Sequence, residues 1–232
     1  FNGADFAFSG AGATLRAPGY GTDAGFVDAA AGTATLTASS HNRVTGAITA
    51  QTTASINSLK IDGANNLTLA ASQTLTIGTA SGTGILLAGG SSTISGGTAL
   101  AASAAANDFA IRVDGTNTLN ISTPLTTSTA GLTKSGAGTL VLAGANTYTG
   151  TVMVNEGTLQ LASGGLLGAT SVGLTVRQGG IFDLAGISVG TVASGTNAVD
   201  IFNGAGTVTN TGAAATLRVG NANGAGYFTG NL

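Results

Sequence analysis

Short stretches in which aliphatic and polar residues alternate recur along the chain. Three of them, "LKI" at 59, "LTL" at 67 and "LTI" at 75, start eight residues apart. Alternation with a period of two over so few residues is typical of a β-strand with one buried face. Gly, Asn, Ser and Thr separate the stretches, and these residues favour turns. The pattern therefore predicts an all-β fold of short strands joined by tight turns.

A longer period is superimposed on this alternation. Two sets of apolar residues recur in steps of 21: Leu119, Leu140, Leu161 and Phe182, and Ile111, Leu132, Met153 and Leu174. A unit of this length with two or three short strands cannot bury its own apolar face, but stacked units can. We therefore predict a parallel β-helix, or β-solenoid, with coils of roughly 20 residues. The 232 residues would form about 11 coils, stacked over roughly 50 Å.

Two similar decapeptides support the repeat. "IDGANNLTLA" (61–70) and "VDGTNTLNIS" (113–122) are offset by 52 residues, which we interpret as two coils plus an insertion at 96–110. Alternation directs the aliphatic side chains of these strands into the coil and Thr68, Asn120 and Gln160 outward. We expect the outward Thr and Asn side chains to form hydrogen-bonded ladders between coils.

Composition agrees with a packed, repetitive fold. The chain has 39 Gly, 2 Pro and no Cys, and only 7% of its residues are charged, so backbone pairing and stacked side chains must supply the stability. The first 54 residues hold five of the eleven aromatic residues and fewer aliphatic pairs. We predict irregular N-terminal coils or a cap over 1–54 and a β-solenoid over 55–232.

Charge and hydropathy exclude two kinds of partner. Seven Lys and Arg against nine Asp and Glu give a net charge of −2, and no basic cluster is present to neutralise phosphates, so we expect no nucleic-acid partner. Residues 63–107 carry no charge. Polar residues nevertheless interrupt every apolar run well before the ~18 residues of a membrane-spanning helix. We therefore expect no membrane insertion by this segment.

The stretch "LTKSGAGTLVLAGANTYTGTVMVNEGTLQL", residues 132–161, resembles a known family. It is similar to the autotransporter-associated β-strand repeat, also called the passenger-associated transport repeat, of bacterial autotransporter passenger domains. The residues that carry this resemblance are Leu132, Lys134, Gly136, Gly138, Leu140, the "GANTYTG" of 144–150, Val154, Gly157 and Leu159.

The resemblance implies a right-handed parallel β-helix that is exported across an outer membrane and resides at the cell surface or is secreted. In that family the repeat is associated with transport and folding of the passenger and not with catalysis. The C-terminal "GAGYFTGNL" keeps the style of the preceding residues, so we expect the chain to be a piece of a longer protein.

Acidic residues are the first candidates for chemistry, because some solenoid enzymes cleave polysaccharides with paired acids on one face. Asp62 and Asp114 occupy matching positions before Gly, where Asp-Gly is foremost a turn signal. Arg112 with Asp114, and Arg177 with Asp183, most simply form solvated cross-strand contacts. We therefore predict no catalytic residues.

His41 is the only histidine and, without Cys, builds neither a triad nor a typical zinc site, so we interpret it as a surface-loop residue. The glycine clusters lack a phosphate-loop Lys and the Asp ligands of calcium repeats. No metal or cofactor site is expected. Tyr20, Tyr148 and Tyr227 could stack on sugars, although isolated tyrosines more often pack.

The leading hypothesis is a structural or adhesive surface segment, a β-helical stalk that associates with copies of itself or with neighbouring coils of a longer chain and contacts a cell-surface or carbohydrate target. Two alternatives stay open. A carbohydrate-active β-helix would gather Asp62, Asp114 or Asp183 with a cation in a groove, and a phage fibre domain would pack as a trimer.

Overall fold

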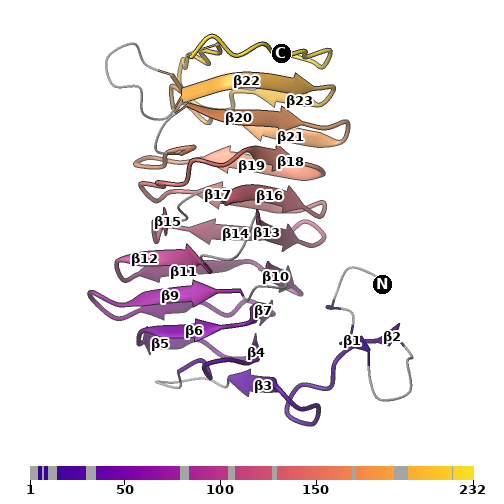
Figure 1. The fold of residues 1–232 in the computed structure, drawn as a ribbon, viewed down its shortest axis with the longest axis vertical. Helices are drawn as coiled ribbons and strands as arrows, with labels where there is room; N and C mark the ends of the chain where they lie inside the picture. The colour runs from indigo at the N-terminus through magenta and orange to yellow at the C-terminus, as the bar shows by residue number, and fades with distance from the viewer. Residues whose placement is uncertain are drawn as a thin grey trace.

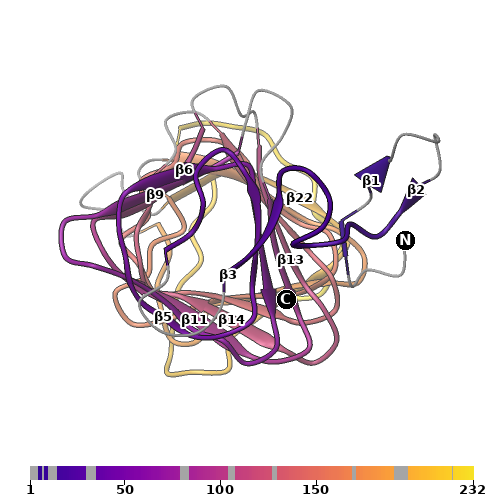
Figure 2. The same cartoon turned by 90° about the horizontal axis from the view of Figure 1, so that it is seen from below.

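The computed structural model describes residues 5–6, 8–9, 15–29, 35–78, 84–103, 108–126, 130–168, 171–190, 198–220 and 222–232. Three parallel sheets wrap around one core and stack coil upon coil (Figure 1). Viewed along the stacking direction, the coils superimpose as a closed ring (Figure 2). The predicted all-β parallel solenoid is confirmed.

Each sheet takes one strand from each successive coil that contributes to it. Sheet 1 contains β3 (Phe26–Ala29), β4 (His41–Val44), β7 (Ser58–Asp62), β10 (Gly84–Ala88), β13 (Asp108–Val113), β16 (Gly131–Ser135), β18 (Val152–Val154), β20 (Ser171–Val176) and β22 (Ala198–Gly204). Sheet 2 contains β5 (Ile48–Gln51), β8 (Leu67–Leu69), β11 (Ser92–Gly96), β14 (Thr118–Ile121), β17 (Thr139–Leu142), β19 (Gly157–Leu161), β21 (Gly180–Asp183) and β23 (Thr207–Thr209). Sheet 3 contains β6 (Ala54–Ile56), β9 (Thr74–Ile77), β12 (Ala99–Ala102) and β15 (Leu125–Thr126).

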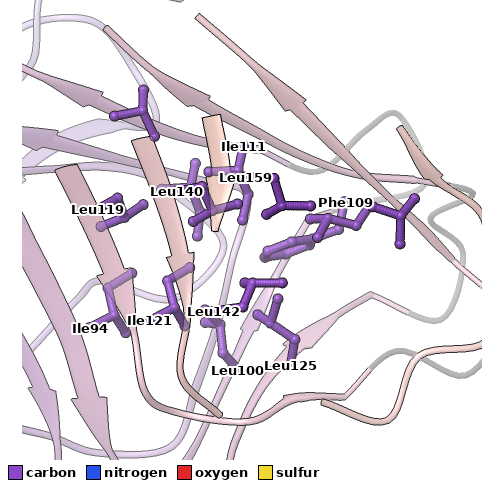
Figure 3. Packing of buried hydrophobic residues seen from close by; sticks show 14 of the residues in the cluster. Ile94, Leu100, Phe109, Ile111, Leu119, Ile121, Leu125, Leu140, Leu142 and Leu159 are labelled. Carbon is purple, nitrogen blue, oxygen red and sulfur yellow. The ribbon is translucent and has the colours of Figure 1, made fainter. Parts of the chain in front are cut away.

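The core is built from the inward positions predicted by alternation. On β14 the side chains of Leu119 and Ile121 are fully buried, while Asn120 between them is only partly buried. Aliphatic side chains of successive coils lie against one another, as Leu119, Leu140 and Leu159 do in Figure 3. Thr68 and Gln160 also lie on the outer side, as predicted. The predicted ladder forms where Thr68 Oγ1 contacts Ser95 Oγ at 3.2 Å, but Asn120 Oδ1 has no partner.

Of the predicted steps of 21 residues, the structure confirms the one from Leu119 to Leu140. Leu140 then pairs with Leu159 and not with Leu161. The second set is wrong from its first step, because Leu132 pairs with Phe109 and Val152 and not with Ile111 or Met153. Coils of roughly 20 residues occur around the repeat, but Ile85 pairs with Ile111, 26 residues along the chain. Turns of different length change the spacing without changing the strand register, because turns lie outside the ladders.

The predicted insertion at 96–110 is also wrong. Ile61 pairs with Leu87, and Leu87 pairs with Val113, so the 52-residue offset of the decapeptides is two coils of 26 residues. Part of the supposed insertion is β12, which pairs with β9 and β15. The largest sheet of the described residues has nine strands, fewer than the predicted 11 coils.

Glycine is required where consecutive coils turn at the same corner. Gly136 and Gly157 have φ of +75° and +66°, which L-residues rarely adopt. A Cβ on Gly157 would also collide with the carbonyl oxygens of Gly136 and Gly138 in the coil below. The glycines of the repeat therefore allow two turns to stack in contact.

The two ends of the solenoid differ. At the N-terminal end, Leu36 is buried in the core, and its backbone N–H donates to Gln51 Oε1 at 2.7 Å. β1 (Phe8–Ser9) and β2 (Leu15–Arg16) form an antiparallel pair beside the ring (Figures 1 and 2). At the C-terminal end, the last residues join the stack through three isolated parallel bridges, Val189–Leu217, Gly204–Phe228 and Thr207–Asn231.

Candidate functional site

A charged cluster lies on the outer side of sheet 1, near its N-terminal end. Asp28, Arg43 and Lys60 are consecutive in register on β3, β4 and β7. Arg43 donates to both carboxylate oxygens of Asp28, at 2.6 and 2.9 Å. Lys60 Nζ binds Asp5 Oδ2 at 2.9 Å, and Asp62 lies 3.8 Å from Lys60 and 3.9 Å from Arg43. Each cation in this cluster therefore has at least two carboxylates within 4 Å.

Aromatic side chains complete the cluster. The Tyr20 ring lies 4.9 Å from the guanidinium carbon of Arg43 and meets Phe26 edge to face at 5.6 Å. His41 stacks on Phe26 at 4.5 Å, and its Nδ1 lies 2.8 Å from Ser58 Oγ. Burial lowers the pKa of His41 and raises that of Tyr20. The interpretation of His41 as a loop residue is wrong, because it lies in β4 between strand neighbours on both sides.

The acids proposed for a catalytic groove are held in separate places. Asp62 belongs to the N-terminal cluster, whereas Asp114 pairs with Arg112 at 2.7 Å. This pair was predicted, but it forms between β13 and the residue that follows it, and not across two strands. Both Asp-Gly sequences form turns in which Asn65 or Asn117 donates its side-chain amide to the Asp carbonyl oxygen. The turn interpretation is confirmed for both positions.

Asp183 does not pair with Arg177, contrary to the prediction. The Asp183 side chain is buried and accepts hydrogen bonds from Gln160, from the backbone of Ala185 and from both the backbone and hydroxyl of Thr211. Burial alone would raise its pKa, but the bonds from Thr211 and Gln160 outweigh it and the pKa is lowered. Asp183 thus connects three levels of the stack and has no free lone pair facing a substrate.

Two of the three tyrosines are buried packing residues, and the third is exposed. Tyr20 and Tyr148 are buried, and in both the hydroxyl has no hydrogen-bond partner in the structure. Tyr227 is 77% exposed and lies on the last coil. Of the three tyrosines, only Tyr227 is placed to stack on a ligand without rearrangement.

Lys134 is a residue whose environment the sequence reasoning missed. Its side chain is fully buried, and Nζ donates to the carbonyl oxygens of Ser135, Gly136 and Glu156 at 2.9, 2.6 and 3.0 Å. Burial lowers its pKa to about 8. The signal was present, because Lys134 shares the inward parity of Leu132 in "LTKS". Its role is to hold two stacked turns together from inside the coil.

Asn146 of the "GANTYTG" stretch has a related role. It is buried, accepts a hydrogen bond from Leu125 N at 2.8 Å and donates one to Leu166 O at 2.7 Å. It therefore bridges the coil below and the coil above. The repeat residues form the joints of the stack.

An apolar cavity of about 360 Å³ opens at the C-terminal end. It is lined mainly by aliphatic and aromatic side chains, together with Thr209 and Asn210: Leu184, Phe202, Val208, Leu217, Val219 and Leu232. The exposed large hydrophobic residues among the described residues are also in this part of the chain: Ile201, Val219, Tyr227 and Leu232.

The described residues contain no group of three His, Cys, Asp or Glu side chains placed to bind a metal ion. Nor does this part of the chain include a helix with the length and apolar character needed to cross a membrane.

The geometry therefore defines a β-solenoid whose repeat residues join coils and whose three candidate acids, Asp62, Asp114 and Asp183, lie in separate places. Residues 132–161 match the Passenger-associated-transport-repeat family, which confirms the resemblance drawn from these residues.

Over an alignment of 89 residues that covers 37% of the chain, the sequence is 39% identical to the Adhesin BmaC autotransporter of Brucella suis biovar 1 (strain 1330). The match spans 2% of that relative's length. No solved structure matches the chain.

Proposed function

We propose that the chain is a structural and adhesive segment of an exported bacterial surface protein. The observation that carries this proposal is the 39% identity to an autotransporter adhesin, in a chain that also contains the passenger repeat. The parallel solenoid supports it, because stacked coils give an extended surface on a rigid scaffold. Nine strands at ~4.8 Å spacing make sheet 1 about 38 Å deep.

The arrangement of the acids supports an adhesive role over the carbohydrate-cleaving alternative. Glycoside hydrolysis requires two carboxyl groups on either side of one bond, ~5 to 9.5 Å apart. Asp62, Asp114 and Asp183 are instead bound by different partners, and Asp183 is enclosed by four hydrogen bonds. We therefore assign these residues to the scaffold.

The test is to immobilise the purified chain on beads and measure bead retention under flow on mammalian cells and on a panel of polysaccharides, together with release of reducing sugar. We expect retention without sugar release, and no change in D62N, D114N or D183N. Retention no greater than that of beads without protein would refute adhesion. Sugar release that disappears in one of these variants would instead establish the enzymatic alternative.

We further propose that the apolar surface of the last described coil packs against a neighbouring coil of a longer chain or against a copy of this chain. The apolar cavity and the side chain of Val219, which is 46% exposed, support this interface.

Association between copies is measured by light scattering after size-exclusion chromatography over a range of concentrations. Wild type is expected to dimerise, and V219D to be monomeric. Ile201→Asp is the matched control, because Ile201 is 39% exposed on β22 but does not line the cavity. A wild type that is monomeric at every concentration, or dimers that only Ile201→Asp disrupts, would overturn association between copies through this surface.

A further inference from the structure

The alternation of buried and exposed positions fails on two neighbouring strands of sheet 1. On β13 the outward residues Ala110 and Arg112 are partly exposed, as the pattern requires. On β7 and β10, however, the outward residues Ser58, Lys60 and Leu86 are 7%, 5% and 2% exposed. Something other than the solenoid must cover this outer strip.

The N-terminal residues lie on the same side. We define the N-terminal arm as the described residues among 5–25, which lie outside the ring beside sheet 1 (Figures 1 and 2). Asp5 reaches Lys60 across 55 residues of sequence, and a Cβ on Gly84 would lie 3.6 Å from Phe6 Cε1. Tyr20 is buried over Arg43 and Lys60. The arm therefore packs on β4, β7 and β10.

The arm is attached mainly by side chains. β1 pairs with β2 alone, so among the described strands no ladder joins the arm to sheet 1. The base of the arm also makes a backbone hydrogen bond to β4, in which His41 N donates to Gly25 O at 2.7 Å.

Across the strip, Asp5 forms an ion pair with Lys60, and Tyr20 contacts Arg43, Lys60 and Phe26. Lys60 and Tyr20 are buried, so salt screens these contacts much less than open surface pairs, and removal of a partner is what weakens them.

The base of the arm has the backbone of a hinge. Gly21 and Gly25 have φ of +78° and +80°, and an added Cβ on Gly25 would meet nothing within 4 Å. Glycines in open space can change φ and ψ without a steric collision. Rotation there would lift the arm and leave β3 in place, since β3 pairs with β4 along its length.

We propose that the N-terminal arm is a releasable strap that shields the outer strip of β7 and β10 and opens when its Asp5–Lys60 contact is lost. Opening exposes Lys60 and Leu86, which are consecutive in register between Arg43 and Arg112. The uncovered surface is a column of basic residues interrupted by one aliphatic side chain.

Cysteine labelling tests the strap directly, because the natural chain has no cysteine. Leu86→Cys reports on the covered strip, and its reaction rate with a water-soluble thiol reagent is measured from 0.05 to 1 M NaCl. Because the Asp5–Lys60 pair is largely buried, salt screens it weakly, and we expect the rate to stay low over this range. Asp5→Asn added to Leu86→Cys should raise the labelling rate about tenfold at every salt concentration.

Two controls and a second probe keep the result interpretable. Leu87→Cys points into the core and should stay unreactive at every salt concentration; reaction there would report unfolding. Asp114→Asn removes a carboxylate of sheet 1 that does not contact the arm and, added to Leu86→Cys, should leave the labelling rate unchanged. Ser58→Cys is a conservative second probe on the strip, used if Leu86→Cys does not fold.

The strap is refuted if the probe on the strip labels at the same rate with and without Asp5→Asn. It is equally refuted if Asp114→Asn accelerates labelling as much as Asp5→Asn does. Faster labelling with Asp5→Asn that Asp114→Asn does not reproduce supports it.

Discussion

Asn146→Ala tests whether the repeat stabilises the solenoid through bridges between coils. The Asn146 side chain is 1% exposed and joins Leu125 N to Leu166 O, two backbone groups from different coils. Alanine removes both bonds and leaves the buried donor of Leu125 and the partly buried acceptor of Leu166 without this partner.

The size of the effect follows from those two groups. A buried backbone group that loses its partner costs about 1 to 3 kcal/mol. Two such groups, one of them relieved in part by small backbone shifts, give an expected loss of about 3 kcal/mol in the free energy of unfolding. Asn155→Ala is the matched control, since its Oδ1 has no partner, and should cost less than about 1 kcal/mol.

The assay is urea unfolding followed by circular dichroism, with hydrogen exchange at Leu125 as a local readout. Solenoid coils need not unfold together, so the exchange rate at this amide separates local opening from global unfolding. If Asn146→Ala and Asn155→Ala lower the unfolding free energy equally, the bridging argument fails.

Three further predictions concern the same repeat. Tyr148→Phe removes a buried hydroxyl that has no partner and should raise the free energy of unfolding by about 1 kcal/mol. A lower free energy of unfolding, measured by urea denaturation, would contradict this. The pKa of Lys134, lowered to about 8 by burial, means that the unfolded chain binds more protons above that pH, so stability should rise by about 1.5 kcal/mol between pH 8 and 9.5. The rise should be absent in Lys134→Met, and the range ends about half a unit below the ordinary tyrosine pKa of about 10, which limits the opposing effect of tyrosine ionisation in the unfolded chain. Gly157→Ala should lower the melting temperature by several degrees, since alanine suits neither its φ of +66° nor the carbonyl groups facing it, while Gly179→Ala, with a similar φ of +90° but open surroundings, should cost less.

Local pattern predicted the strands and their inward faces well. Leu67, Leu119 and Leu159 all lie in the core as their alternation required, because a strand residue reaches the same face as its second neighbour wherever the strand is placed. The pairing of coils was predicted less well. Leu140 meets Leu159 and not Leu161, since a turn can gain or lose residues without any change in the strands that it joins.

At the candidate site, too, local features were predicted correctly and contacts between coils were not. The two Asp-Gly turns were predicted correctly, because the interactions that form them are within three residues. His41 was misplaced, since its environment comes from Phe26 and Ser58 in other coils. Asp5 and Lys60 are 55 residues apart, and no local pattern joins them.

By itself the sequence determined that this chain is built of short strands with stacked turns, and its repeat identified the kind of surface protein that it resembles. Those properties depend on period, parity and glycine position, which are local. Only the tertiary structure decided which residues meet across coils: Lys134 against turn carbonyls, Asn146 between two coils, and the N-terminal arm over β7 and β10. These contacts depend on the lengths of the intervening turns and on the path of a segment outside the ladder, and neither is encoded in the alternation of the strands.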